Sequence, residues 1–232
     1  MKKTFCFLVL LGFLFVSSTS VAEFQTDVEM GYFTDFVGGA GPLIHDGSVF
    51  QQSVTLSWWN TSFKIWNSIS PKGGANNDFG DEFDLMVSNN AINIGPVNLD
   101  VGIAYFDLYD IREIEGDLFA VYTTVSWSKL FLYVEGDIPQ DKDILEGGML
   151  YKFGVNHDFL EETKFTFHSC LSIAGKDGLE RVEYTRLVLN KNFKTKFGIF
   201  TPSFSSQTNL GNDNAGAAKN KVWGGLKWSK TF

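Results

Sequence analysis

Residues 97–105 of the chain read VNLDVGIAY, an alternation of large apolar side chains with small or polar ones. Successive side chains of a β-strand point to opposite faces, so this stretch predicts a strand with one apolar and one polar face. The same alternation recurs in 49–59, 144–155 and 163–173, while helical periodicity is weak along the chain. The pattern therefore predicts an all-β protein.

We expect about twelve strands, at residues 24–36, 48–59, 62–70, 81–89, 97–108, 116–127, 129–137, 144–155, 163–174, 180–192, 195–204 and 220–232. Strand 180–192 is the least regular, because Val182, Tyr184 and Val188 place Arg186 on the apolar face, and a bulge would explain it. Tight connections such as Ser128 roughly alternate with longer ones rich in Gly, Asn and Asp, such as 205–219. This alternation is typical of an up-and-down antiparallel barrel of the bacterial outer membrane.

Three features favour a transmembrane barrel over a secreted soluble barrel or sandwich, which stays the alternative. One face of nearly every strand is polar or charged, which suits the wet interior of a wide barrel. Strands of about 10 residues, at roughly 3.3 Å rise and 45° tilt, cross about 25 Å, the height of the apolar band. Aromatic residues also gather near predicted strand ends, as in interfacial girdles. They are Trp58, Phe63, Trp127, Phe153, Phe165, Phe197 and Trp228 on the short-turn side, and Phe36, Phe50, Phe83, Tyr105 and Phe119 on the loop side.

The N-terminal segment 1–22 has the features of a cleaved signal peptide. Lys2 and Lys3 precede the apolar run 5–16, and Ser20-Val21-Ala22 is an A-x-A-like cleavage site. We therefore expect one barrel domain at 23–232. The whole chain carries a net charge of -8, and cleavage would remove two lysines and no acid. Such an acidic chain does not suit nucleic acid as a partner.

The C-terminal end resembles the signal by which outer-membrane proteins are passed to their assembly machinery. Phe232, Trp228 and Leu226 match its alternation, and Lys230 departs from it. The chain also resembles TorF-type porins, in the stretches 28–36, 63–68 and 80–84, although Val37-Gly38-Gly39 stands where that family has an Arg-Gly pair. This resemblance implies a channel-like barrel surrounded by outer-membrane lipid.

The sequence offers no convincing catalytic group. His168 and Ser169 are strand neighbours that point to opposite faces, so they cannot form a catalytic dyad. No pair of His or Cys has metal-ligand spacing, and we expect neither a metal nor another cofactor. The run 38–41 leads into Pro42 rather than into a helix, which predicts a flexible loop and not a phosphate site. We therefore expect a protein without enzymatic activity.

The polar strand face predicts a pore with a mild acidic excess. Its candidate lining residues are Asp84, Asp100, Asp107, Glu135, Asp137, Glu146, Lys152, Glu183 and Lys227. Inward aromatic residues, namely Trp59, Trp66, Tyr122 and Trp223, would narrow it. Because rings of carboxylates favour cations, the sequence predicts passive diffusion of small hydrophilic solutes or ions with a weak cation preference. A closed barrel with a structural or loop-mediated binding role is the alternative, and whether loop 205–219 constricts the lumen stays open.

Overall fold

The structure, a computed structural model, describes residues 24–39, 43–71, 81–107, 117–139, 148–160, 162–174, 180–211 and 220–232. The expected signal peptide 1–22 lies outside these ranges. All regular secondary structure in the described ranges is β. No helix long and apolar enough to cross a membrane occurs in this part of the chain.

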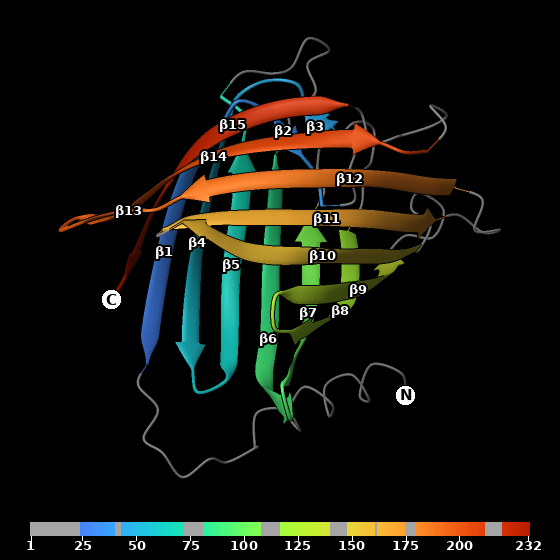
Figure 1. Ribbon diagram of the computed structural model, residues 1–232, viewed down its shortest axis with the longest axis horizontal. Helices are drawn as coiled ribbons and strands as arrows, with labels where there is room; N and C mark the ends of the chain where they lie inside the picture. The colour runs from blue at the N-terminus through green and yellow to red at the C-terminus, as the bar shows by residue number, and fades with distance from the viewer. Residues whose placement is uncertain are drawn as a thin grey trace.

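Twelve antiparallel strands form a closed barrel, as the alternation predicts. They are β1 (Gln25–Phe33), β4 (Val49–Trp58), β5 (Thr61–Ile69), β6 (Glu82–Ile94), β7 (Val97–Asp107), β8 (Asp117–Trp127), β9 (Leu130–Pro139), β10 (Gly148–Leu160), β11 (Thr163–Ala174), β12 (Glu180–Lys191), β14 (Gly198–Asn209) and β15 (Lys221–Thr231). Three short strands are additional, namely β2 (Phe36–Val37), β3 (Leu43–His45) and β13 (Phe193–Thr195). Figure 1 shows that strands at the front and the back of the barrel cross, as strong strand tilt requires.

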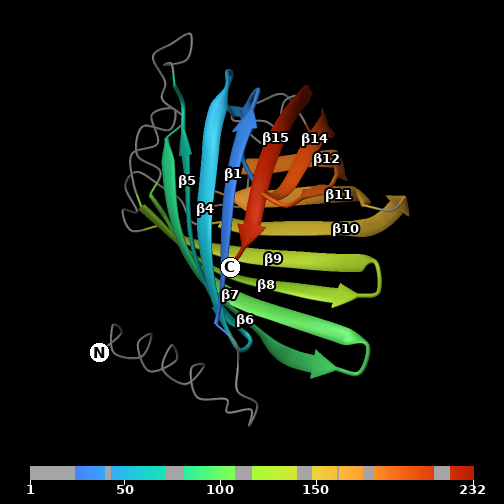
Figure 2. The same cartoon turned by 90° about the vertical axis from the view of Figure 1, so that its left-hand side faces the viewer.

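The first and last strands close the barrel. β1 pairs with β15 along its length, from Asp27 opposite Thr231 to Phe33 opposite Gly225, and Figure 2 shows the two strands side by side. At the end of this seam, Thr26 and Phe232 exchange two backbone hydrogen bonds of 2.8 and 3.1 Å. On its other side β1 pairs with β4, with Phe33 opposite Val49. Each of these strands is therefore paired on both sides, which leaves the wall without a free edge.

The outer face of the barrel is apolar. Met30, Val121 and Phe153 are 53%, 56% and 59% exposed. The residues next to each of them in the strand point to the opposite face of the sheet, where the polar and the buried side chains lie. A soluble protein turns its apolar strand face inward, whereas a membrane barrel turns it toward lipid. Within the described residues, the register confirms the predicted parity over 49–58, 97–107, 148–155 and 163–173.

Several predicted strand ends were wrong because polar residues that suggest turns lie inside strands. β6 runs on to Ile94 through an irregularity between Asn89 and Ile92, so that only a tight turn separates it from β7. β10 likewise reaches Leu160. Residues 205–209 belong to β14 and do not form a loop, and 212–219 lie outside the described residues.

Two other expectations on the strands are corrected. β12 pairs with β11 without a register shift, so the expected bulge is absent from the described residues of β12. Trp59 does not face the lumen: it lies in the turn between β4 and β5, with a φ of 53°, and stacks on Trp58 with ring centroids 4.4 Å apart. A tight hairpin turn needs such a left-handed residue.

A lysine placed on the outer face tests whether that face meets lipid. We expect Val121→Lys to lower the free energy of unfolding in lipid bilayers by about 2–4 kcal/mol, because the charge would lie in hydrocarbon. Thr124→Lys, on the inward parity of the same strand, is the matched control and should cost much less. Urea titration in lipid vesicles measures both. Equal effects of the two substitutions would contradict the lipid-facing assignment.

Candidate functional site

The strand register places six of the predicted pore-lining residues on the inward parity. They are Asp84, Asp100, Glu135, Asp137, Lys152 and Lys227. Lys227 Nζ pairs with Glu29 Oε1 on the adjacent strand at 2.7 Å. Glu135 accepts a hydrogen bond from the Tyr133 hydroxyl. Asp84 is buried, and one oxygen of each of Asp84, Asp100 and Asp137 is buried without a hydrogen-bond partner among the described residues.

Two predicted pore-lining residues lie on the other parity. Asp107 pairs with Phe83, and Glu183 pairs with Leu171, in rows that carry the outward apolar side chains. Asp107 is the last residue of β7, where the strand leaves the apolar band and an outward carboxylate can meet water. A third candidate, Glu146, lies outside the described residues.

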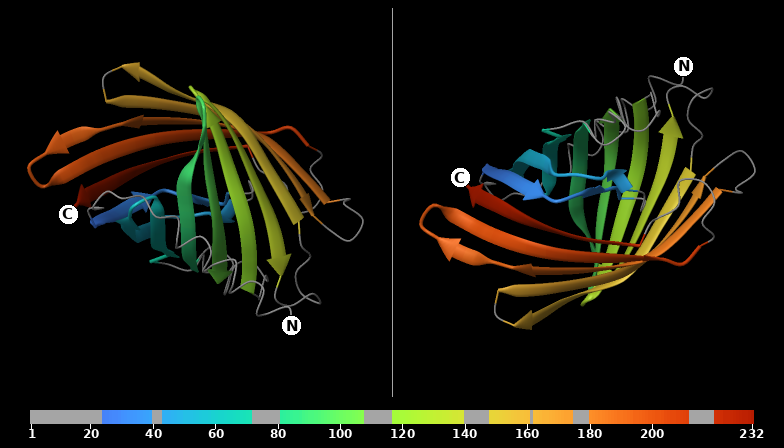
Figure 3. Two further views of the ribbon diagram at one scale, coloured as in Figure 1. Left: turned by 90° about the horizontal axis from the view of Figure 1, so that it is seen from below. Right: turned by 90° about the horizontal axis from the view of Figure 1, so that it is seen from above.

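A segment between β1 and β4 folds inward. We call residues 34–39 and 43–48 the strap; it contains β2 and β3, which pair with each other. Figure 3 shows these strands within the ring of the barrel wall. Phe36, Leu43 and His45 are buried, and the Phe36 ring lies 5.9 Å from the ring of Trp66 on β5. The expectation that Phe36 belongs to an outer aromatic girdle is therefore wrong.

The strap reaches across the lumen to the far wall. The Tyr184 hydroxyl on β12 donates to Gly39 O at 2.7 Å, and Arg186 Nη2 donates to Gly38 O at 2.9 Å. A methyl group on Gly39 would lie 3.3 Å from Lys152 Nζ on β10. Four strands, β15, β14, β12 and β11, separate β1 from β10 around the ring. The strap therefore spans much of the interior, and the described part of the run 38–41 is held by the wall.

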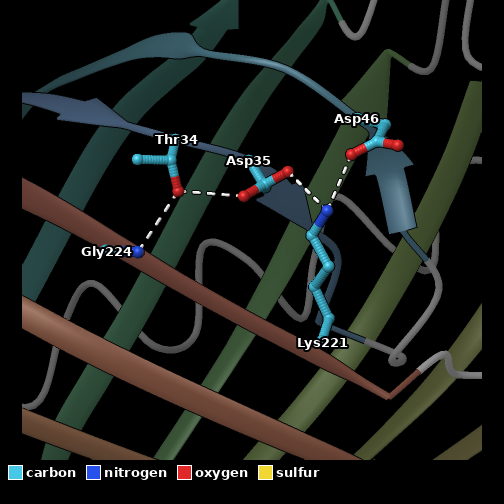
Figure 4. A network of polar contacts seen from close by, with 5 residues as sticks. All are labelled: Thr34, Asp35, Asp46, Lys221 and Gly224. Carbon is cyan, nitrogen blue, oxygen red and sulfur yellow. Dashed lines mark hydrogen bonds and ion pairs between the residues drawn. The ribbon is translucent and has the colours of Figure 1, made fainter.

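A single lysine holds both ends of the strap. Lys221 Nζ lies 2.8 Å from Asp35 Oδ1 and 2.7 Å from Asp46 Oδ1 (Figure 4). Thr34 adds a second attachment to β15, because its hydroxyl accepts a hydrogen bond from Gly224 N at 3.2 Å and its backbone N–H donates to Gly224 O at 2.9 Å. Both ends of the strap are thus fixed to β15, the last strand of the barrel.

Besides Lys64 on β5 and the paired Glu29, Lys221 and Lys227, two groups of charged residues face the lumen. We call Asp84, Asp100, Glu135 and Asp137, on β6 to β9, the acidic wall, and Lys152 and Arg186, on β10 and β12, the basic wall. Lys152 and Arg186 form no salt bridge among the described residues. Arg186 instead donates to Gln207 Oε1 at 2.6 Å and lies over the rings of Tyr184 and Trp223. Lys152 lies over the Tyr133 ring at 4.8 Å.

Sequence reasoning missed Arg186, Tyr184 and Lys221. In β12 the prediction takes hydrophobic residues to face lipid. Tyr184 instead faces the lumen, and it is fully buried there because the strap packs against it. The signal that could have revealed this lies in the strap itself. Leu43 and Ile44 are apolar residues in an otherwise Gly-rich connection. An exposed loop has no reason to carry them.

Comparison with known proteins finds similar folds only. No protein-family model and no curated protein matches the chain. A solved NanC porin is 12% identical, covers 89% of this chain and 98% of its own, and has a TM-score of 0.53. A structure from a study of in-meso crystallization of membrane proteins is 9% identical, with 90% and 84% coverage and a TM-score of 0.53. An outer membrane channel from Pseudomonas putida F1 is 12% identical, with 93% and 97% coverage and a TM-score of 0.48. The two structures with a TM-score of 0.53 show a similar barrel fold and no more at these identities, and the TorF-type resemblance stays a prediction.

Loss of the buried Phe36 ring should loosen the strap. We expect Phe36→Ala to increase proteolytic cleavage within residues 34–48, because truncating a buried aromatic side chain removes about 3–5 kcal/mol of packing. Phe50→Ala, which truncates an outward ring close by on β4, should leave cleavage of this segment unchanged. Limited proteolysis of the folded protein with mass spectrometry of the fragments measures both. Protection of the segment in the Phe36 variant would contradict the anchoring role.

Proposed function

We propose that the protein is a porin-like channel of the bacterial outer membrane that allows passive diffusion of small hydrophilic solutes. The observation that carries the proposal is the inversion of the barrel, with an apolar exterior and inward Asp, Glu, Lys and Arg side chains. Charged groups line the inside of a membrane barrel at little cost only where water reaches them. The likeness to a NanC porin supports the same fold.

We also propose a weak preference for cations. The acidic wall supplies four carboxyl groups against three inward cations, Lys64, Lys152 and Arg186, while Lys227 is paired with Glu29. Carboxylates that line a pore lower the energy of a passing cation and raise that of an anion. The lumen should therefore admit cations and neutral small solutes more readily than anions.

A closed barrel is the second candidate, because the strap spans the interior and Tyr184 is fully buried. Such a barrel would act as a structural protein or bind partners through its external loops. Planar bilayers separate the two candidates. Discrete conductance steps from detergent-extracted, heat-modifiable protein support the channel, whereas silence from the same folded protein supports the closed barrel.

The partners that we propose are outer-membrane lipid and the assembly machinery that inserts such barrels. Leu226 and Trp228 lie on the outward parity of β15, opposite Tyr32 and Met30 of β1, and Phe232 is 66% exposed at its end. An exposed, alternating apolar strand at the end of the chain suits recognition by strand addition before the barrel closes.

Removal of charge from the acidic wall tests the preferred ion. We expect Asp100→Asn combined with Glu135→Gln to lower the cation-to-anion permeability ratio by about twofold or more, since two inward charges are lost. Asp107→Asn combined with Glu183→Gln removes two outward charges from the same barrel and should leave the ratio unchanged. Reversal potentials in a KCl gradient give both ratios. An unchanged ratio in the inward pair would contradict the lumen assignment.

A further inference from the structure

The strap lies against the basic wall. On β12 and β15 the strap contacts the wall through the carbonyl oxygens of Gly38 and Gly39, through Asp35 and Asp46, and through Thr34. Carbonyl oxygens and carboxylates are the groups that an arginine, a lysine or a tyrosine hydroxyl binds. The strap therefore presents acceptor groups to the cationic side of the lumen.

The acidic wall does not share these contacts with the strap; Asp84 is buried there, and Asp100, Glu135 and Asp137 are half-buried. The strap reaches β5 through the Phe36 ring, β12 through Gly38 and Gly39, and β15 through Thr34, Asp35 and Asp46, and none of these contacts is with a residue of the acidic wall. The Gly39 backbone also lies beside Lys152 on β10. Asp100, Glu135 and Asp137 are therefore the carboxyl groups of the acidic wall that have exposed surface.

We propose that the strap determines the ion selectivity of the lumen by covering Arg186 and Lys152, so that solutes meet the acidic wall. This proposal rests on the proposed channel function. A group covered by packed chain lies farther from a permeating ion and acts on it less, because the Coulomb energy falls with distance. Withdrawal of the strap therefore exposes two cations and shifts the preference toward anions.

Substitutions of Lys221 and Lys227 test the proposal, because the two variants should shift the cation-to-anion permeability ratio in opposite directions. Both face the lumen from β15, but Lys221 holds Asp35 and Asp46 of the strap, whereas Lys227 holds Glu29 on β1. Loss of either positive charge should, by charge alone, favour cations. We expect Lys227→Met to raise the cation-to-anion permeability ratio, and Lys221→Met to lower it by about twofold or more, because the freed strap uncovers the basic wall. Permeability ratios that rise in both variants would overturn the proposal.

Cys170 gives a second readout that does not need a conducting pore. It is buried on the inward parity of β11, opposite Tyr184. The register of Phe33 opposite Val49 allows a short hairpin turn to replace residues 34–48. With Cys6→Ser as background, Cys170 is the one thiol in the chain. The folded protein in detergent is treated with an anionic and with a cationic methanethiosulfonate, with the strap present or replaced.

Replacement of the strap should expose Cys170 and let the anionic reagent react about tenfold faster than the cationic one, because Arg186 and Lys152 attract it. With the strap present, Cys170 should react slowly with both, and Cys170→Ser should abolish labelling. Equal rates for the two reagents, or a thiol that stays unreactive after replacement, would overturn the proposal. If labelling behaves as expected but every variant is silent in bilayers, the channel function fails while the covering of the basic wall is supported.

Discussion

The structure depends on the pairing of β1 with β15. Backbone N–H and C=O groups in hydrocarbon have no water to bind, so a sheet can cross a membrane only when no strand is left unpaired. Seven residue pairs, from Asp27–Thr231 to Phe33–Gly225, pair the facing backbone groups of β1 and β15, while β4 and β14 pair their other edges. With the wall closed, one side of every strand faces lipid and the other faces an enclosed lumen. The apolar exterior and the charged interior follow from that separation.

The strap forms a small packed core inside the barrel. Phe36, Leu43 and His45 of the strap are buried, and so are Tyr184 and Leu150 of the wall. The lumen is therefore not uniformly polar: the side that carries the strap buries apolar and aromatic side chains, while the side with β6 to β9 combines the buried Ala104 and Ala120 with carboxyl groups. On this asymmetry rests the proposal that solutes meet mainly the acidic side of a lumen whose inward charges are mixed.

Much of the wall was predictable from the sequence, and the strap was not. Where a strand faces lipid on one side and polar groups on the other, as in 97–105 and 163–173, parity alone identified both faces. It failed at Tyr184, Arg186 and Glu183, because the inward side of β12 is itself covered and so carries large hydrophobic and aromatic groups. At Asp107 the charge was the misleading signal: the parity of 97–105 puts this residue on the outward face, and beyond the apolar band that position carries no hydrophobic requirement. The contacts of the strap join residues far apart in the sequence, such as Gly39 with Tyr184, and no local pattern encodes such a pairing.

The position of the strap near the N-terminus has a consequence for the order of folding. Its partners are synthesised last, since Asp46 and Lys221 are separated by 175 residues and Gly38 and Arg186 by 148. Contacts between such distant residues carry a large loop-closure cost and form after local hairpins. We expect the strap to take its place only when β12 and β15 have joined the wall, so that seating of the strap and final closure of the seam belong to one late, slow event.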